Sequence, residues 1–228
     1  MAGIFLTGTD TEIGKTQVAC ALLNAISKQN IKAVGMKPVA SGAEQIGDSG
    51  ADQWQNEDAM KLMKASSVQL PYELINPYLF KIPASPHIAA TLDHKKINLD
   101  EIVGCYKLIE QQAEFIVVEG VGGWLAPLND QQTVEDMALA LQLPVVLVVG
   151  MRLGCLNHAL LTAQRVQQSG LTLAGWVANI ADSNFSFLNE NINTLIEGIN
   201  APLIAQLNCN EKQFNANYEK SISLLVNA

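Results

Sequence analysis

Residues 8–16, GTDTEIGKT, combine two glycines with a lysine and a hydroxyl between an apolar run and a helical pattern. The apolar run covers 3–6, and apolar residues recur at helical spacing over 17–26. In such a loop the glycines let backbone N–H groups turn inward on phosphate oxygens, Lys15 reaches the terminal phosphates, and the Thr16 hydroxyl can ligate Mg²⁺. The N-terminal dipole of the following helix adds attraction for an anion. The segment therefore predicts a phosphate-binding loop for a nucleoside triphosphate.

The loop departs from the standard spacing, because five residues separate Gly8 from Gly14 where the common motif has four. The alternative interpretation is a glycine-rich turn that opens a helix by chance. The strand-like run before the loop and the helical pattern after it favour phosphate binding, because the motif requires both.

Charged residues follow two further apolar runs, at the point where each run ends. Lys37 and Ser41 follow the run 32–36, and Glu119 follows the run 115–118. Ligands of open parallel sheets bind beyond the carboxyl ends of the strands. Lys37 is therefore a candidate second cation beside the loop if both strands are central, with a solvated surface lysine as the alternative. Glu119 takes the position of the Mg²⁺-holding carboxylates of P-loop proteins.

The glycines after Glu119 resemble part of a dinucleotide-binding fingerprint. That pattern needs a glycine where Leu125 stands. The sequence therefore argues against a nicotinamide site.

Three polar residues have both a functional and an ordinary interpretation. Asp58 opens a predicted helix, either as a metal ligand or as a first-turn acid favoured by the helix dipole. Asn157 is placed to cap a helix, either with its free amides facing an anion or as an ordinary cap. Asn179 offers an amide donor and acceptor that suit an adenine edge, or it lies in a turn. His158, beside Asn157, indicates nothing by itself.

Apolar runs recur along the chain and indicate strands that are buried on both faces. Continuous Val, Ile and Leu residues, rather than alternating ones, mark parallel strands covered by helices on each side. The runs lie at 3–6, 32–36, 115–118, 144–149, 173–178 and 201–204, and helical patterns lie at 57–65, 98–113, 133–142, 157–169 and 185–198. This order predicts a doubly wound α/β fold with a mainly parallel sheet and helices on both faces. Four prolines within 66–91 predict that no helix runs through that segment.

The composition predicts one globular domain over residues 1–228, with 49% hydrophobic and 16% charged residues. The formal net charge of −8 disfavours nucleic acid and anionic membranes as partners. No apolar run reaches the roughly 18 residues of a membrane span, and no basic-then-apolar signal segment is evident, so we expect a cytoplasmic protein. No zinc site or disulfide framework is expected from the spacing of the cysteines and histidines, which are Cys20, Cys105, Cys155, Cys209, His87, His94 and His158.

Five segments in the same order resemble the dethiobiotin synthetase family, which catalyses the penultimate step of biotin synthesis. They are TGTDTEIGKT at 7–16, KPVASG at 37–42, VEGVGGW at 118–124, LGCLNH at 153–158 and AGWVAN at 174–179. NPY at 76–78 and SPH at 85–87 are also similar to that family. The match spans residues 3 to 205 approximately, and five ordered motifs are far more specific than the phosphate loop alone.

The resemblance implies that diaminopelargonic acid takes up CO₂ as a carbamate, that ATP with Mg²⁺ phosphorylates it, and that the second amine closes a cyclic urea. Lys37 and Lys15 would be the catalytic cations, and Thr16, Asp58 and Glu119 would hold Mg²⁺. The implied ATP site comprises Glu12, Ile13, Gly14, Lys15, Thr16, Gln17, Asp58, Glu119, Gly120, Val121, Gly122, Asn179 and Ile180. The implied substrate contacts are Thr11, Lys37, Ser41, Gly154, Cys155, Leu156 and Asn157. The family is dimeric, which implies a homodimer whose partner subunit supplies the segment 154–158.

Residues 207–210 depart from the family pattern of Ile-Pro followed by a bulky residue, and the nucleotide preference stays open. One rival is a switch ATPase of the partitioning or cell-division type, which the acidic balance and the absence of an additional lysine early in the loop disfavour. A second rival is the synthetase half of an amide-forming enzyme such as a cobyrinic acid amidase, whose glutaminase domain would not fit in 228 residues.

Overall fold

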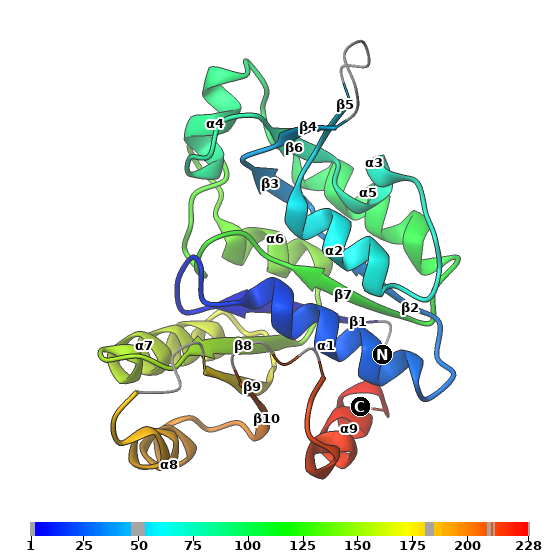
Figure 1. Cartoon of the computed structure of the whole chain (residues 1–228). Coiled ribbons are helices and arrows are strands. Elements are labelled where there is room, and N and C mark those ends of the chain that lie inside the picture. The colour runs from blue at the N-terminus through cyan, green and yellow to red at the C-terminus, as the bar shows by residue number, and fades with distance from the viewer. Residues whose placement is uncertain (1–2, 47–52, 181–184, 209–210, 212, 228) are drawn as a thin grey trace.

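The computed structural model describes residues 3–46, 53–180, 185–208, 211 and 213–227, and its centre is a six-stranded parallel sheet (Figure 1). The strand order is β10-β9-β8-β1-β7-β2. The strands are β1 (Gly3–Gly8), β2 (Ala33–Met36), β7 (Phe115–Glu119), β8 (Val145–Gly150), β9 (Leu173–Ile180) and β10 (Leu203–Asn208). Every residue of β1, β2, β7 and β8 is buried, which confirms the prediction from the continuous apolar runs.

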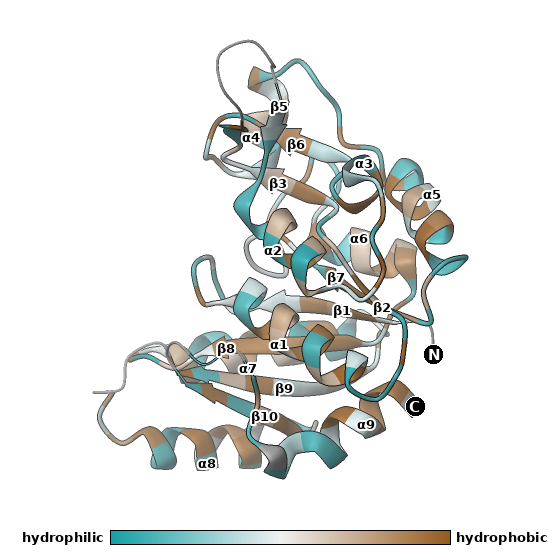
Figure 2. Cartoon of the chain, turned by 45° about the vertical axis from the view of Figure 1, so that its right-hand side comes forward, coloured by the Kyte–Doolittle hydropathy of each residue, from teal (hydrophilic) through white to brown (hydrophobic). Residues whose placement is uncertain are grey.

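Helices cover both faces of this sheet, as predicted. The longer helices are α1 (Lys15–Ser27), α2 (Glu57–Ala65), α5 (Leu99–Glu110), α6 (Val134–Leu141), α7 (Cys155–Gln168), α8 (Leu188–Gly198) and α9 (Glu219–Asn227). Ile4 and Leu6 of β1 belong to the core cluster under α1 and α9, whereas Phe5 belongs to the cluster under α5 to α8. Successive residues of the strand thus pack into the core clusters on opposite faces of the sheet, because side chains alternate across a sheet. Apolar residues run along the central strands in Figure 2, while helices such as α5 and α8 are mixed.

The proline-rich segment 66–91 carries no continuous helix, which confirms that prediction. It contains two short helices, α3 (Tyr72–Ile75) and α4 (Pro86–Leu92), and the strand β6 (Tyr78–Phe80). Pro86 is the first residue of α4, a position where its missing N–H costs nothing. Strand β6 pairs in parallel with β3 (Val39–Ser41), and β4 (Glu44–Ile46) pairs with β5 (Gln53–Gln55). The sequence patterns did not predict these two small sheets.

One condition stated for Lys37 is not met, and one positional prediction was wrong. Strand β2 is an edge strand of the main sheet, since β7 lies between it and β1, so the two strands are not both central. Helix α7 begins at Cys155 with Gly154 as its N-cap, so Asn157 lies inside the first turn and is not the cap. Gly154 has φ 93, a left-handed conformation that favours glycine at this position.

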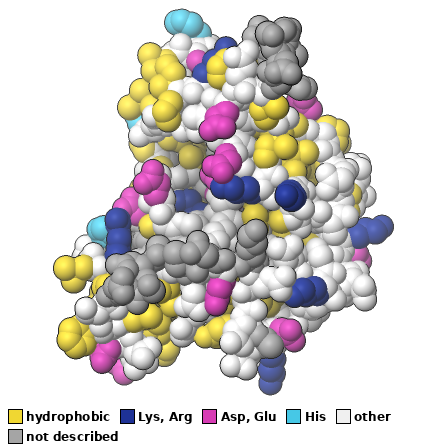
Figure 3. Space-filling model, viewed as in Figure 1, with side chains coloured by type: hydrophobic (Ala, Val, Ile, Leu, Met, Phe, Trp, Pro, Cys, Tyr) yellow, Lys and Arg dark blue, Asp and Glu magenta, His cyan; other side chains and the backbone are white. Residues whose placement is uncertain are grey.

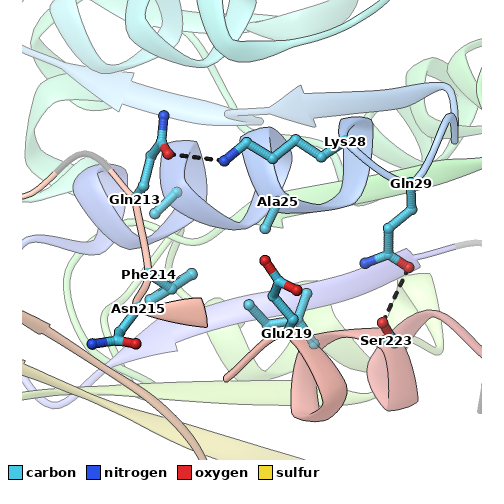
Figure 4. Close-up of a pocket in the computed structure, with 10 residues that line it drawn as sticks. Ala25, Lys28, Gln29, Gln213, Phe214, Asn215, Glu219 and Ser223 are labelled. Carbon is cyan, nitrogen blue, oxygen red and sulfur yellow. Dashed lines mark hydrogen bonds between the residues drawn. The ribbon is translucent and has the colours of Figure 1, made fainter. Parts of the chain in front are cut away.

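The C-terminal segment packs along α1, an arrangement that was not predicted. Gln17 near the start of α1 donates to the Glu211 carbonyl at 2.9 Å, and Lys28 just after its end donates to Gln213 at 2.8 Å. A cavity of about 250 Å³ lies between α1 and α9, with Phe214 and Glu219 among its lining residues (Figure 4). This cavity lies beside the second half of α1, away from the phosphate loop. No described helix combines the length and apolar character needed to cross a membrane.

Candidate active site

Asn179, at the end of β9, holds the loop between β1 and α1 in place through a hydrogen bond. The Asn179 Nδ2 atom donates to the Ile13 carbonyl at 2.7 Å, and Asn179 is 2% exposed. The Ile13 side chain fills the space above Gly8 and Gly150, where a Cβ on either glycine would lie 2.7 Å from it. Ile13 and Asn179, both expected at the ATP site, therefore support the loop through contacts with the sheet. Ile180 is buried next to Asn179.

Gly14 is required at the turn into α1 for two reasons. Its φ is 82, and a Cβ there would lie 2.1 Å from Asn179 Nδ2. We expect Gly14→Ala to weaken ATP binding by about tenfold or more, because the left-handed conformation alone costs about 1–2 kcal/mol and the loop must also leave Asn179. Calorimetric titration with ATP and Mg²⁺ measures this. Gly170→Ala is the matched control, since Gly170 has φ 88 and no atom within 4 Å of the added Cβ. Equal ATP affinities in the two variants would contradict the prediction.

Lys15, the first residue of α1, is a buried lysine with a lowered pKa. Its Nζ donates to the Asp10 carbonyl at 2.7 Å, within the loop itself. Burial and the neighbouring charge of Lys37 lower the pKa of Lys15 to about 8, against smaller opposing effects of Glu119 and Asp58. A phosphate placed here would raise the pKa of Lys15 again, because an adjacent anion favours the charged form.

Lys37 lies between two carboxylates at the carboxyl end of the sheet. Its Nζ is 2.6 Å from Glu119 Oε1 and 3.4 Å from Asp58 Oδ2, and it also approaches the Gly120 carbonyl at 3.4 Å. Burial would lower the pKa of Lys37, but Glu119 and Asp58 together outweigh burial and raise it. Lys37 is thus a permanently charged, buried ammonium and not a solvated surface lysine.

The proline-rich segment explains how Lys37 is held although β2 is an edge strand. The Lys37 backbone N–H donates to the Ile75 carbonyl at 2.9 Å, and Asn76 Nδ2 donates to the Lys37 carbonyl at 2.7 Å. Tyr78 N–H donates to the Pro38 carbonyl at 3.1 Å. Asn76 was not predicted as a site residue, although it belongs to the NPY motif that the sequence singled out.

Asn56 fixes the position of Asp58 and was also missed. Its Oδ1 accepts from the Asp58 N–H at 3.1 Å and so caps α2, while its Nδ2 reaches the carbonyls of Ser41 and Gly42 at 3.4 Å. The Tyr72 hydroxyl accepts from the Asn56 N–H at 2.8 Å. An asparagine before a helix is an ordinary cap signal, so the sequence alone could not show that this cap joins α2 to residues 41–43 at the end of β3, here called the Ser41 loop.

A cavity of about 380 Å³ brings most of the predicted residues together in front of the loop. Lining residues are contributed by the phosphate loop, the ends of β2 and β7, the Ser41 loop and α2. They are Thr11, Glu12, Gly14, Lys15, Thr16, Gln17, Lys37, Ala40, Ser41, Asn56, Asp58, Lys61, Glu119, Val121 and Gly122. Predicted substrate contacts 154–157 do not line this cavity; they form the start of α7. The atypical segment 207–210 lies in part outside the described residues, since 209 and 210 are not among them.

The oxygen atoms around Glu119 fit a hard divalent cation. The Thr16 hydroxyl donates to Glu119 Oε1 at 2.8 Å. The second oxygen, Oε2, is buried and has no hydrogen-bond partner among the described residues. With Asp58 nearby, the set offers a hydroxyl and two carboxylates, and Mg²⁺ needs only one or two carboxylates beside phosphate oxygens and water. These residues therefore fit the magnesium ion that the sequence motifs imply.

Comparison with known proteins assigns the fold and then the family. A family model described as an AAA domain matches residues 2–216. A solved ParA family ATPase from Chlorobium tepidum TLS has a similar fold, with a TM-score of 0.54 and 16% identity, over 97% of this chain and 89% of that chain. Together with the phosphate loop and its acidic strand end, this defines a P-loop NTPase-like α/β protein.

Two relatives identify the family within that class. The ATP-dependent dethiobiotin synthetases BioD of Janthinobacterium sp. (strain Marseille) and Aromatoleum aromaticum are 47% and 50% identical to this chain. Each match covers 88% of this chain, and 85% and 87% of the respective relatives. The chain belongs to the ATP-dependent dethiobiotin synthetase family and is an enzyme, which confirms the resemblance of the sequence motifs.

Proposed function

We propose that this enzyme converts diaminopelargonic acid, CO₂ and ATP to dethiobiotin, ADP and phosphate. Family membership supports an ATP-dependent synthesis of dethiobiotin in the biotin pathway. The observation that carries the proposal is the position of Lys37, a buried ammonium 2.6 Å from Glu119 in the cavity that Lys15 and Thr16 also line. Such fixed charges lower barriers where negative charge develops, as in phosphoryl transfer.

The proposed reaction has three balanced steps. An amine nitrogen of the substrate bonds to CO₂ and loses a proton, which gives a carbamate. A carbamate oxygen then attacks the γ-phosphorus of ATP and releases ADP, which leaves a carbamic-phosphoric anhydride. The second amine attacks the carbonyl carbon, phosphate departs with the bonding electrons, and the cyclic urea forms after loss of a proton.

Each residue of the cavity has a task in this scheme. Lys15 binds the terminal phosphates, and Lys37 stabilises the carbamate oxygen and the transferring phosphoryl group. Thr11 and Ser41 contact the diamine. Thr16, Glu119 and Asp58 would hold Mg²⁺, which when bound neutralises charge on the phosphate oxygens. No protein nucleophile takes part, because positioning and electrostatic stabilisation are sufficient for this chemistry.

The direct test of the function is product formation. Purified protein is given ATP, Mg²⁺ and bicarbonate, with and without diaminopelargonic acid, while ADP and dethiobiotin are measured by chromatography and mass spectrometry. We expect ADP release that depends on the diamine and equals the dethiobiotin formed. ATP turnover that ignores the diamine would overturn the proposal and favour a switch ATPase.

We further propose that the enzyme acts in the cytoplasm as a homodimer of single-domain subunits. The start of α7 would serve the partner's cavity, since Gly154 to Asn157 do not line the cavity of their own chain. The adjoining Leu153 is 93% exposed in the single subunit, so a partner that packed on the start of α7 would also bury this side chain.

Subunit mixing tests this arrangement. Lys37→Ala and Asn157→Ala proteins are each expected to be impaired, but their mixed dimer would contain one cavity with both residues intact. We therefore expect the mixture, after subunit exchange, to exceed the average activity of the two variants. Activity equal to that average, in a preparation shown to contain mixed dimers, would contradict a shared site.

A further inference from the structure

Lys61 is a third lysine at the nucleotide cavity, beside Lys15 and Lys37. It lies on α2 three residues after Asp58, so the two side chains are neighbours on the helix surface. Acidic and basic side chains gather in the middle of the face shown in Figure 3, over the region of α1 and α2. Neither the phosphate-loop motif nor any other motif of the sequence includes Lys61.

Lys61 lies on the side of α2 that borders the nucleotide cavity, since it lines this cavity together with Thr16 and Asp58. Burial and the charge of Glu119 raise the pKa of the Cys20 thiol to about 12, against an opposing effect of the Lys61 ammonium. Cys20 lies one turn after Thr16 on α1. The ammonium of Lys61 therefore acts on the same region as the carboxylates of the proposed metal site.

The present partner of Lys61 is weakly bound. Its Nζ is 2.7 Å from Glu57 Oε1, with the two side chains 52% and 68% exposed. Exposed pairs of this kind contribute little to stability and exchange easily. A hydrogen bond from Lys61 to Glu57 raises the pKa of Lys61, so the ammonium remains charged at neutral pH.

The cavity needs such a cation once a nucleotide enters. Lys37 is already neutralised by Glu119 and Asp58, and Glu12 adds a further carboxylate to the lining. A triphosphate adds several negative charges, which Lys15 and one bound Mg²⁺ together do not fully balance. An exposed ammonium in a surface ion pair costs little to redirect, and it gains a charge-assisted hydrogen bond to a phosphate oxygen.

We propose that Lys61 is a phosphate-binding residue of this site, and that its ammonium leaves Glu57 to bind the phosphate chain of the nucleotide. The proposal rests on the proposed use of ATP. It makes Glu57 a competitor of the nucleotide, so loss of the Glu57 charge strengthens binding. If the ion pair only stabilised α2, substitution of Lys61 and substitution of Glu57 would not change the ATP affinity in opposite directions.

The test is the dissociation constant of ATP with Mg²⁺, measured by calorimetry for four variants. We expect Lys61→Gln to weaken binding by roughly three- to tenfold, an effect that grows at low salt, and Lys61→Arg to recover most of the loss. We expect Glu57→Gln to tighten binding by about two- to threefold. The matched control is Lys64→Gln, an exposed lysine on the same helix that does not line the cavity.

Unchanged ATP affinity in Lys61→Gln, or weaker binding in both Lys61→Gln and Glu57→Gln, would overturn the assignment. Thermal unfolding of each variant without nucleotide verifies that α2 is intact. Product formation by the wild-type protein separates the two proposals. A wild type that makes dethiobiotin while Lys61→Gln binds ATP normally overturns only the role of Lys61. A wild type that binds ATP without making dethiobiotin, with Lys61→Gln weakened, overturns only the proposed reaction.

Discussion

Lys37→Ala is expected to reduce the rate of dethiobiotin formation by a factor on the order of 10² or more at saturating substrates, because it removes a preorganised charge from the transition state. Lys37 is 4% exposed and lies against Glu119 and Asp58. Steady-state ADP release and dethiobiotin yield measure the effect.

The same substitution has a stability consequence that can be separated from catalysis. Removing one partner of a buried ion pair costs about 3–5 kcal/mol, since the other charge stays buried. Glu119 is 1% exposed, so we expect Lys37→Ala to unfold at a lower temperature and to regain part of the loss on addition of Mg²⁺. Lys37→Gln keeps a donor for Glu119 and serves as the better-folded variant. The control is Lys32→Ala, an exposed lysine at the other end of β2. Near-normal turnover by folded Lys37→Gln and Lys37→Ala would contradict the catalytic role.

Local patterns predicted the features of this fold that depend on short stretches of chain. The apolar runs predicted the six strands of the main sheet because most residues of these strands are covered on both faces. The rule that parallel strands end at one edge of the sheet placed Lys37 and Glu119 near the phosphate loop, and in the structure their charged atoms lie 2.6 Å apart. That argument holds even though β2 is an edge strand, because β7 lies between β2 and β1 and carries Glu119.

Contacts between distant segments could not be predicted in this way. Asn179 looked suited to an adenine edge, but its amide N–H holds the Ile13 carbonyl, 166 positions away in the chain. Asn56 looked like an ordinary helix cap, and nothing local indicated that it also reaches the Ser41 carbonyl. Lys61 resembled any surface lysine with an acid four residues before it. In each case the side chain has a common local explanation. Only the folded structure shows the second contact of Asn179 and of Asn56, and the place of Lys61 in the cavity lining.

Glu119→Gln is expected to raise the Mg²⁺ concentration needed for half-maximal activity by a factor on the order of 10², which corresponds to about 2.7 kcal/mol. A carboxylate close to a divalent cation in a partly desolvated site contributes several kcal/mol. Gln keeps the size of the side chain and an oxygen for the Thr16 hydroxyl, so the loss is mainly one of charge.

Asp58→Asn is the companion variant. A shift similar to that of Glu119→Gln would favour direct ligation by Asp58, whereas a much smaller shift would favour its role as a partner of Lys37 and a first-turn acid of α2.

The control for Glu119→Gln is a buried carboxylate outside the cavity. Glu135 is 7% exposed, accepts from the Trp124 indole at 2.7 Å and is held by Arg165 through two hydrogen bonds of 2.8 and 2.6 Å. Glu135→Gln should therefore lower the free energy of unfolding without altering the Mg²⁺ requirement. If both variants merely lost stability and kept the wild-type Mg²⁺ dependence, Glu119 would be a structural partner of Lys37. If only Glu119→Gln shifts the Mg²⁺ requirement, Glu119 is a metal ligand. This would explain why its buried Oε2 atom lacks a hydrogen-bond partner among the described residues, because the bound ion would supply the compensating charge.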